Sequence, residues 1–243
     1  MDKDSLILLP HLDDEFAISP ILKNIISKAG KNCKFIFFAE RNNESKKIRQ
    51  IRREECIKSL NFFGVNRSEI IFMNDHLHVD DLKIYEKTNE IKSYLSEYHQ
   101  KNPIYKIYTL NLEGGHPDHD SLALIVDKFC TKLNIKKYFL PSYNSRKTLF
   151  FPISVLRPLK SQLRYFKTKK INVFDWYSSL KIAYVYKSER SAFLKLLPFL
   201  VIKTLFSYQV YLTNKISIET VDWENSLTKT RYKVDINSIL QKV

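Results

Sequence analysis

The stretch LILLPHLDDE, residues 6–15, places polar side chains directly after a short apolar run. Leu6 to Leu9 have the length and composition of a buried strand bounded by polar residues. In an open parallel sheet, ligands bind beyond the carboxyl ends of the strands. We therefore expect a binding or catalytic site here, built from the polar side chains that follow the strand: His11, Asp13, Asp14 and Glu15.

The adjacent carboxylates of Asp13 and Asp14 repel each other, and a nearby cation would remove that conflict. Two backbone shapes remain open at this point. If the chain stays extended, His11 and Asp13 share a face. If it curls into a helical turn, His11 and Asp14 come together and Asp13 is left for another role.

A second polar run, GGHPDHD at residues 114–120, follows the apolar segment YKIYTLNL. Two of the four glycines, Gly114 and Gly115, stand before it and permit close approach of the backbone to a ligand. The run supplies His116, Asp118, His119 and Asp120. Together, the two runs contain three imidazoles and several carboxylates, which is the ligand chemistry of a mononuclear zinc hydrolase.

The first 145 residues alternate apolar runs of strand length with amphipathic stretches of helical length, which predicts an α/β domain with a mainly parallel sheet. The expected strands are Leu6 to Leu9, Cys33 to Ala39, Ile70 to Met73, Tyr105 to Leu110 and Lys137 to Leu140. The expected helices run from Ser19 and Pro20 to Gly30, from Ser45 to Phe63, from Leu82 to Tyr98 and from His119 to Leu133.

The chain has 243 residues, of which 44% are hydrophobic, and this suits one domain. We expect residues 1–145 to form the core that carries the metal site. Residues 146–243 form an irregular basic portion, with a helical stretch near Leu180 to Leu197, that completes the fold and the cleft. The three cysteines form no CxxC pair, which favours a reduced, cytoplasmic setting without disulfides.

The formal net charge of +14 attracts anions. An anionic group attached to a small substrate is one consequence, and a binding module for anionic membrane or nucleic acid is the alternative function. We expect no nucleic acid partner, because the chain contains no zinc finger, RNP segment or recognisable helix-turn-helix. The apolar stretch Leu194 to Leu212 is interrupted by Lys195, Pro198 and Lys203. These interruptions favour a buried helix over a membrane span and leave peripheral membrane contact open.

The remaining histidines carry weaker signals. His76 and His78 in NDHLHVDD, residues 74–81, could form a loop pair, but we expect them to be polar side chains exposed to solvent. His99 has the position of a residue at the end of a helix. We expect none of the three to belong to the metal site.

The two polar runs resemble the PHPDDE and HPDH motifs of the zinc-dependent amino-sugar deacetylases, a family that includes the GlcNAc-phosphatidylinositol de-N-acetylases and the LmbE-like proteins. The first motif reads PHLDDE here and the second reads HPDH. RREECIKSLNFFGV, with Arg52, Glu55 and Gly64, and KIAYVYKSE, residues 181–189, are similar to two further family segments. Leu12 replaces a proline, ISP replaces a glycine-rich helix start and AERNN replaces Asp-Gly-Glu.

This resemblance implies a Rossmann-like fold with helices on both faces of the sheet, and removal of an N-acetyl group from an N-acetylglucosamine-type sugar. Hydrolysis of another amide or ester is the alternative reaction, and iron(II) would also accept such ligands. The resemblance further implies that His11, Asp14 and His119 hold Zn2+ and that Asp13 is the general base. His116 would stabilise the oxyanion or protonate the leaving nitrogen, and Asp118 would orient a histidine.

Overall fold

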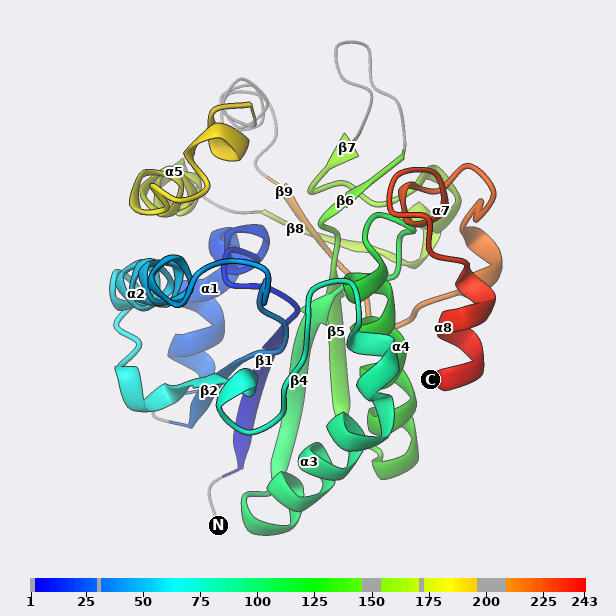
Figure 1. The fold of residues 1–243 in the computed structure, drawn as a ribbon, viewed down its shortest axis with the longest axis horizontal. Coiled ribbons are helices and arrows are strands. Elements are labelled where there is room, and N and C mark those ends of the chain that lie inside the picture. Colours follow the sequence, from blue (N-terminus) through cyan, green and yellow to red (C-terminus); the bar gives the residue numbers. More distant parts are fainter. Residues whose placement is uncertain (1–2, 30–31, 146–153, 171–172, 196–208) are drawn as a thin grey trace.

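A central sheet of five parallel strands organises the molecule (Figure 1). The computed structural model describes the chain except residues 1–2, 30–31, 146–153, 171–172 and 196–208. The strand order is β3-β2-β1-β4-β5. The strands are β1 (Asp4–Leu9), β2 (Cys33–Phe37), β3 (Ile70–Phe72), β4 (Ile104–Leu110) and β5 (Lys136–Leu140). The predicted Rossmann-like sheet is confirmed, with strand ends that differ by one or two residues.

The strand order creates a crevice between β1 and β4. From β1 the chain moves outward through β2 to β3, and it then returns to β4 on the other side of β1 and continues to β5. β1 and β4 are hydrogen-bonded neighbours, with Ile7 opposite Tyr108. Because their crossovers leave in opposite directions, the loops after these two strands flank the switch point where open α/β sheets bind ligands.

Helices cover both faces of the sheet (Figure 1). Successive side chains of a strand point to opposite faces, so Ile7 and Leu9 belong to one apolar cluster and Leu6 and Leu8 to another. The first cluster includes residues of α1 (Glu15–Ala29) and α2 (Lys46–Asn61). The second includes residues of α3 (Thr88–Lys101) and α4 (Pro117–Leu133).

The predicted start of the first helix is wrong. Helix α1 begins at Glu15, so Pro20 lies inside the helix rather than at its first position. Proline has no N–H to donate to the carbonyl of Phe16, four residues earlier. The hydroxyl of Ser19 donates to that carbonyl at 2.8 Å and so satisfies it. The predicted end at Gly30 lies outside the described residues.

Two other helix starts also differ from the prediction. Helix α4 begins two residues early, at Pro117, because proline suits the first helical position and His116 caps the helix. Helix α3 begins at Thr88 instead of Leu82, since Leu82 has a positive φ of 68° and the 3-10 turn η3 (Ile84–Lys87) intervenes. Helix α2 agrees with the prediction, and the Ser45 side chain caps it.

The C-terminal portion adds to the layers built by the first 145 residues. Helix α5 (Val173–Val185) packs against α1, and α8 (Ile236–Lys242) packs against α4. Strand β8 (Lys167–Lys170) pairs with β9 (Gln209–Leu212), and Thr213 bridges to Phe139 of β5. The short elements are η1 (Arg67–Glu69), η2 (Met73–Asp75), β6 (Tyr143–Asn144), β7 (Ser154–Val155), η4 (Lys160–Tyr165), η5 (Ile218–Thr220) and α7 (Leu227–Thr230).

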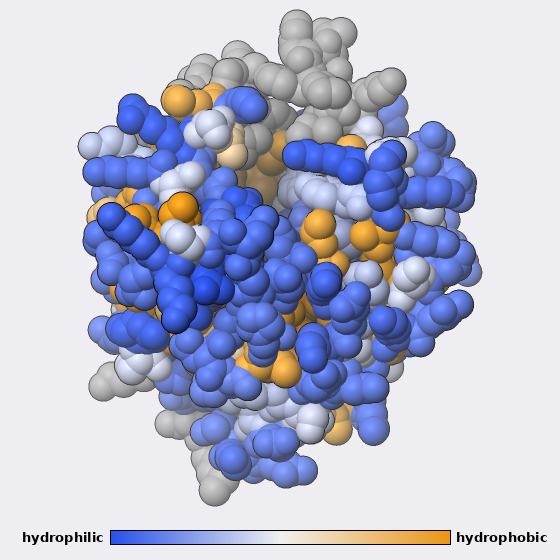
Figure 2. Space-filling model, in the orientation of Figure 1, coloured by the Kyte–Doolittle hydropathy of each residue, from blue (hydrophilic) through white to orange (hydrophobic). Residues whose placement is uncertain are grey.

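The helical stretch expected near Leu180 to Leu197 is displaced. Helix α5 starts earlier, at Val173, and stops at Val185, and residues 190–195 are helical again. Most of the apolar stretch 194–212 lies outside the described residues. Within the part of the chain that the structure describes, no helix has the length and apolar character needed to cross a membrane. The face in Figure 2 is largely hydrophilic, with apolar residues in small separate groups.

Candidate metal centre

The loop after β1 curls into a helical turn, which decides between the two backbone shapes left open by the sequence. The amide of Asp14 donates to the carbonyl of His11 at 3.3 Å, and the amide of His11 donates to Oδ2 of Asp14 at 2.9 Å. The turn brings the side chains of these two residues together, with Nδ1 of His11 3.2 Å from Oδ2 of Asp14. Asp13 also lines the pocket, beside Arg52.

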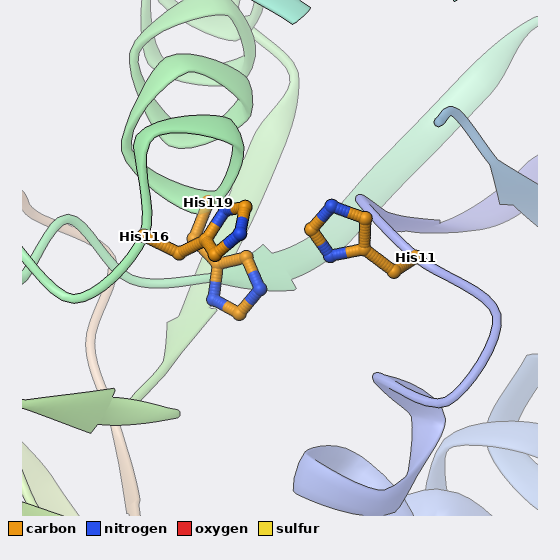
Figure 3. A group of neighbouring side chains, drawn as sticks. All are labelled: His11, His116 and His119. Atoms are coloured by element: carbon orange, nitrogen blue, oxygen red, sulfur yellow. The ribbon is translucent and has the colours of Figure 1, made fainter. Parts of the chain in front are cut away.

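The loop after β4 brings two more imidazoles to the same place (Figure 3). His116 is the N-cap of α4, and His119 lies in its first turn. The ring centroid of His116 lies 4.7 Å from that of His11 and 5.1 Å from that of His119. Nε2 of His119 lies 3.3 Å from Oδ1 of Asp14, so the two sequence motifs meet at that carboxylate.

The glycine before His116 is required by close packing. A Cβ atom added at Gly115 would lie 1.9 Å from the carbonyl oxygen of Tyr143, a distance that no side chain tolerates. This contact explains the glycine that the sequence analysis associated with close approach of the backbone. The backbone that approaches is that of Tyr143, whose side chain also lines the pocket.

Asp118 is fully buried and holds His11 in one orientation. Its carboxylate accepts hydrogen bonds from the amides of Leu82 at 2.7 Å and Ile84 at 3.0 Å. Oδ2 of Asp118 also lies 3.0 Å from Nε2 of His11. An ionised carboxylate only accepts hydrogen bonds, so Nε2 of His11 carries the proton that joins them, and Nδ1 is the ring atom that faces Asp14.

Asp81, which the sequence motifs did not single out, enters the site from the loop after β3. Oδ1 of Asp81 lies 3.2 Å from Nε2 of His11 and 3.9 Å from Nε2 of His116. This oxygen is buried and has no hydrogen-bond partner among the described residues. The available signal was the Asp80–Asp81 pair, which follows the two histidines of NDHLHVDD and repeats the acid pair of the first motif.

The charges in this cluster perturb one another strongly. Burial alone lowers the pKa of His11, but the nearby carboxylates of Asp118, Asp14 and Asp81 outweigh it and raise the pKa well above its ordinary value. Burial raises the pKa of Asp13, and the neighbouring charge of Asp14 raises it further. Burial lowers the pKa of His116, and the positive charges of His11 and His119 add to that effect.

The donors have the types and spacing to hold a divalent metal ion. In two sets, the ligand atoms all lie within 4.8 Å of one another. One set is His11, His116 and His119, and the other is His11, Asp81, His116 and Asp118. Asp14 contacts both His11 and His119. Imidazole and carboxylate donors, with one buried carboxylate oxygen lacking a hydrogen bond, fit a cation of the zinc type.

Each motif also contains an acid whose hydrogen bonds hold the surrounding segments together. Glu15 accepts hydrogen bonds from the hydroxyls of Ser59 and Tyr186, and burial raises its pKa to about 8. Asp120 accepts from the amide of Gly114 at 3.0 Å and from the hydroxyl of Thr228 at 2.7 Å, and burial raises its pKa to about 6.

The two other segments that carried the family resemblance meet beside the pocket. Glu55 of α2 accepts hydrogen bonds from the amides of Lys187 at 3.0 Å and Ser188 at 3.1 Å. Arg52, one helical turn earlier, forms an ion pair with Glu189. These contacts attach the segment after α5 to the wall of the pocket.

His76, His78 and His99 are not part of the two metal-ligand groups found among the described residues. His76 and His78 are exposed. His99 lies in the last turn of α3, where its Nδ1 accepts a hydrogen bond from the amide of Ile104 at 3.0 Å. A helix-end role for His99 is therefore confirmed.

The fold and the cluster together describe an α/β protein with a group of imidazoles and carboxylates that could hold a metal ion at the switch point of its sheet. The chain belongs to the family described as PIG-L, GlcNAc-PI de-N-acetylase, which matches residues 6–130. This match confirms the family resemblance seen in the two motifs. A search of curated proteins returns no match.

Several solved structures share the fold. N,N'-diacetylchitobiose deacetylase from Pyrococcus horikoshii is 17% identical, with a TM-score of 0.61 over 87% of this chain and 84% of that one. The A40926 pseudoaglycone deacetylase Dbv21 is 13% identical, with a TM-score of 0.60 over 88% and 97%. GalB, a 4-carboxy-2-hydroxymuconate hydratase from Pseudomonas putida, is 10% identical, with a TM-score of 0.51 over 87% and 94%. Because a hydratase shares this fold, the fold alone does not determine which reaction a protein catalyses.

Proposed function

We propose that this protein is a zinc-dependent hydrolase that removes the N-acetyl group from an N-acetylglucosamine-type sugar or glycoconjugate. Membership of the de-N-acetylase family supports the reaction. The names of two structural neighbours describe deacetylases, one of them acting on diacetylchitobiose. The cluster of imidazoles and carboxylates supports the use of a metal.

The proposed ligands are Nδ1 of His11, the carboxylate of Asp14 and Nε2 of His119. The observation that carries the proposal is the position of Asp14, whose Oδ2 lies 3.2 Å from Nδ1 of His11 and whose Oδ1 lies 3.3 Å from Nε2 of His119. Asp118 then has the role of orienting His11, because a ligating histidine commonly donates its second N–H to a carboxylate.

His116 is a hydrogen-bond donor to the substrate in this proposal, not a ligand. Its Nδ1 accepts a hydrogen bond from the amide of Asp118 at 3.2 Å, so Nδ1 carries no proton. Neutral His116 therefore carries its proton on Nε2, which then has no lone pair for a metal. The lowered pKa of His116 favours this neutral form.

The reaction adds water across the amide bond and yields acetate and a free amine. Bound zinc would supply a Lewis acid and a water molecule of lowered pKa. Asp13 takes a proton from the attacking water, and Nε2–H of His116 donates to the oxygen that gains negative charge. The nitrogen must gain a proton before it leaves, and either Asp13 or His116 supplies it.

The decisive experiment combines metal analysis with an acetate-release assay on the purified full chain. We expect about one zinc per chain and acetate from at least one N-acetylglucosamine compound in a panel of mono-, di- and nucleotide-linked sugars. Zinc without acetate from any N-acetyl sugar would contradict the substrate class and point to another amide or an ester. Absence of a tightly bound divalent metal would contradict the mechanism.

A further inference from the structure

A second cavity adjoins the metal pocket and differs from it in charge. Its lining includes Lys46, Arg49, Arg53, Glu40, Asn42 and His78. Glu40 and Arg49 also line the metal pocket, so the two cavities share a wall. The second cavity therefore lies where the part of a substrate that extends beyond the reacting group can reach it.

Two of the cations in the second cavity have no acidic partner. Arg53 forms ion pairs with Glu40 at 2.7 Å and with Asp75 at 2.7 Å. Among the described residues, Lys46 and Arg49 have no carboxylate oxygen within 4.0 Å. In the part of the chain that the structure describes, Glu40 is the only carboxylate that lines this cavity, and Arg53 already engages it. Two positive charges are thus left for a ligand.

Arg49 is also held in place by neutral groups. Its Nη1 donates to Oδ1 of Asn42 at 2.8 Å. The side-chain amide of Asn42 lies 3.1 Å from Nε2 of His78, and the backbone amide of Asn42 donates to Asp80 at 3.2 Å. One nitrogen of the guanidinium is therefore used to fix its position, and the remaining N–H groups of the fork can bind an anion.

The lining of the metal pocket contains more acidic than basic side chains. Its lining contains Arg41, Arg49 and Arg52 but also five carboxylates: Asp13, Asp14, Glu40, Glu44 and Asp81. Arg41 and Arg52 are both paired with Glu189. Of the arginines that line the metal pocket, Arg49 is therefore the one that has no acidic partner among the described residues, and together with Lys46 it attracts an anionic substituent toward the wall that the two cavities share.

We propose that Lys46 and Arg49 form a subsite for an anionic group, such as a phosphate or a carboxylate, carried by the substrate on the side away from its acetamido group. This proposal rests on the proposed function, since it takes the acetamido group to be held at the metal. The arginine fork recognises the planar or tetrahedral anion, and Lys46 adds a point charge. The subsite selects between substrates and takes no part in the bond that breaks.

The test compares kcat/KM for acetate release from N-acetylglucosamine 1-phosphate, UDP-N-acetylglucosamine and the neutral methyl glycoside. We expect the wild type to prefer at least one anionic compound over the neutral one, and Arg49→Gln to lower that preference about tenfold. Lys46→Gln lowers it by a smaller factor, since a solvated lysine contributes less. The two anionic compounds distinguish an anion on the sugar from a more distant one.

Two matched controls remove the same charge elsewhere. Lys47 is the exposed neighbour of Lys46 and lines neither cavity, and Arg164 is exposed on η4. Lys47→Gln and Arg164→Gln should leave the preference at its wild-type value. A preference that is unchanged in Arg49→Gln, or that falls equally in the controls, would overturn the subsite.

A binding measurement separates failure of the subsite from failure of the proposed function. Titration calorimetry with N-acetylglucosamine 1-phosphate is run on wild type, Arg49→Gln and Lys46→Gln in the same metal state. Phosphate that binds a metal does so in all three proteins, so the difference between them reports the subsite. Weaker binding by the variants supports the subsite even if no acetate is released, whereas equal binding by all three overturns it.

Discussion

The two loops of the candidate metal centre each contain an acid that faces the imidazoles and another that turns away from them. In the β1 loop, Asp14 contacts His11 and His119, whereas Glu15 is bound by the hydroxyls of Ser59 and Tyr186. In the β4 loop, Asp118 contacts His11, whereas Asp120 is bound by amides of its own loop and by Thr228.

The difference shows that neighbours in a motif need not share a role. Successive residues of a helical turn point about 100° apart. Acids that are one or two positions apart in the sequence therefore have different surroundings. Asp14 and Asp118 contact imidazoles, whereas Glu15 and Asp120 accept hydrogen bonds from hydroxyls or amides of the surrounding structure. Substitution of one residue at a time separates these two roles.

The largest effect is expected from removal of a proposed ligand. His11→Ala should reduce bound zinc from about one per chain to background and abolish acetate release. Metal analysis after gel filtration measures the first effect and the acetate assay the second. His76→Ala, in an exposed loop, is the matched control and should keep both.

Removal of the proposed base should separate chemistry from metal binding. Asp13→Asn keeps the size of the side chain and should retain zinc while kcat falls by about 10²- to 10⁴-fold. Metal content and kcat are measured on the same preparation. Zinc loss equal to that of His11→Ala would make Asp13 a ligand and contradict its role as base.

His116 distinguishes the proposed ligand set from the cluster of three histidines. In His116→Asn, an amide oxygen can replace Nδ1 as the cap of α4 while Nε2 is lost. We expect zinc to be retained and kcat to fall by about 10²- to 10³-fold. A variant that folds normally but no longer binds zinc would show that His116 is a ligand.

Loss of the hydrogen bonds made by Glu15 or Asp120 should lower the stability of the fold and leave metal binding unchanged. Thr228→Val removes the buried hydroxyl that donates to Asp120 and should lower the free energy of unfolding by about 1–3 kcal/mol. Denaturant unfolding measures this loss, and metal content should not change. Thr131→Val, at an exposed position, should change stability by less than about 0.5 kcal/mol.

Glu113, buried in the β4 loop, should make stability depend on pH. Burial raises its pKa in the folded protein to about 8, above the unfolded value of about 4.3. Between these values, the folded state holds a proton that the unfolded state has lost. The free energy of unfolding therefore falls as pH rises, by up to about 1.4 kcal/mol per pH unit.

Glu113→Gln should make this slope shallower between about pH 5 and pH 7. Unfolding curves at several pH values measure the slope, which a constant loss of hydrogen bonding does not alter. Part of the slope should remain, because the pKa of Glu15 is raised in the same way. An identical slope in wild type and variant would mean that Glu113 is ionised in the folded protein throughout this range.

Much of the fold followed from local patterns. The apolar runs predicted all five strands of the parallel sheet, and Ser45 marked the start of α2 correctly. The start of α1 was missed because a hydroxyl satisfies the carbonyl that Pro20 leaves without a donor. The start of α3 was missed because Leu82 adopts a positive φ, which no pattern of hydrophobic residues reports.

Strand ends followed by histidines and acids are visible in the amino-acid pattern, so the chemistry of the two motifs could be inferred without coordinates. Which of these groups come into contact depends on how the chain packs in three dimensions. The strand order puts the β1 and β4 loops side by side, and the loop after β3 adds Asp81. The folded chain also brings Glu55 of α2 within hydrogen-bond distance of the amide of Ser188, which lies 133 residues later in the sequence. The spacing of hydrophobic residues along a segment indicates whether that segment is a helix or a strand. Contacts between distant segments depend instead on the order of the strands in the sheet and on the direction in which each loop turns.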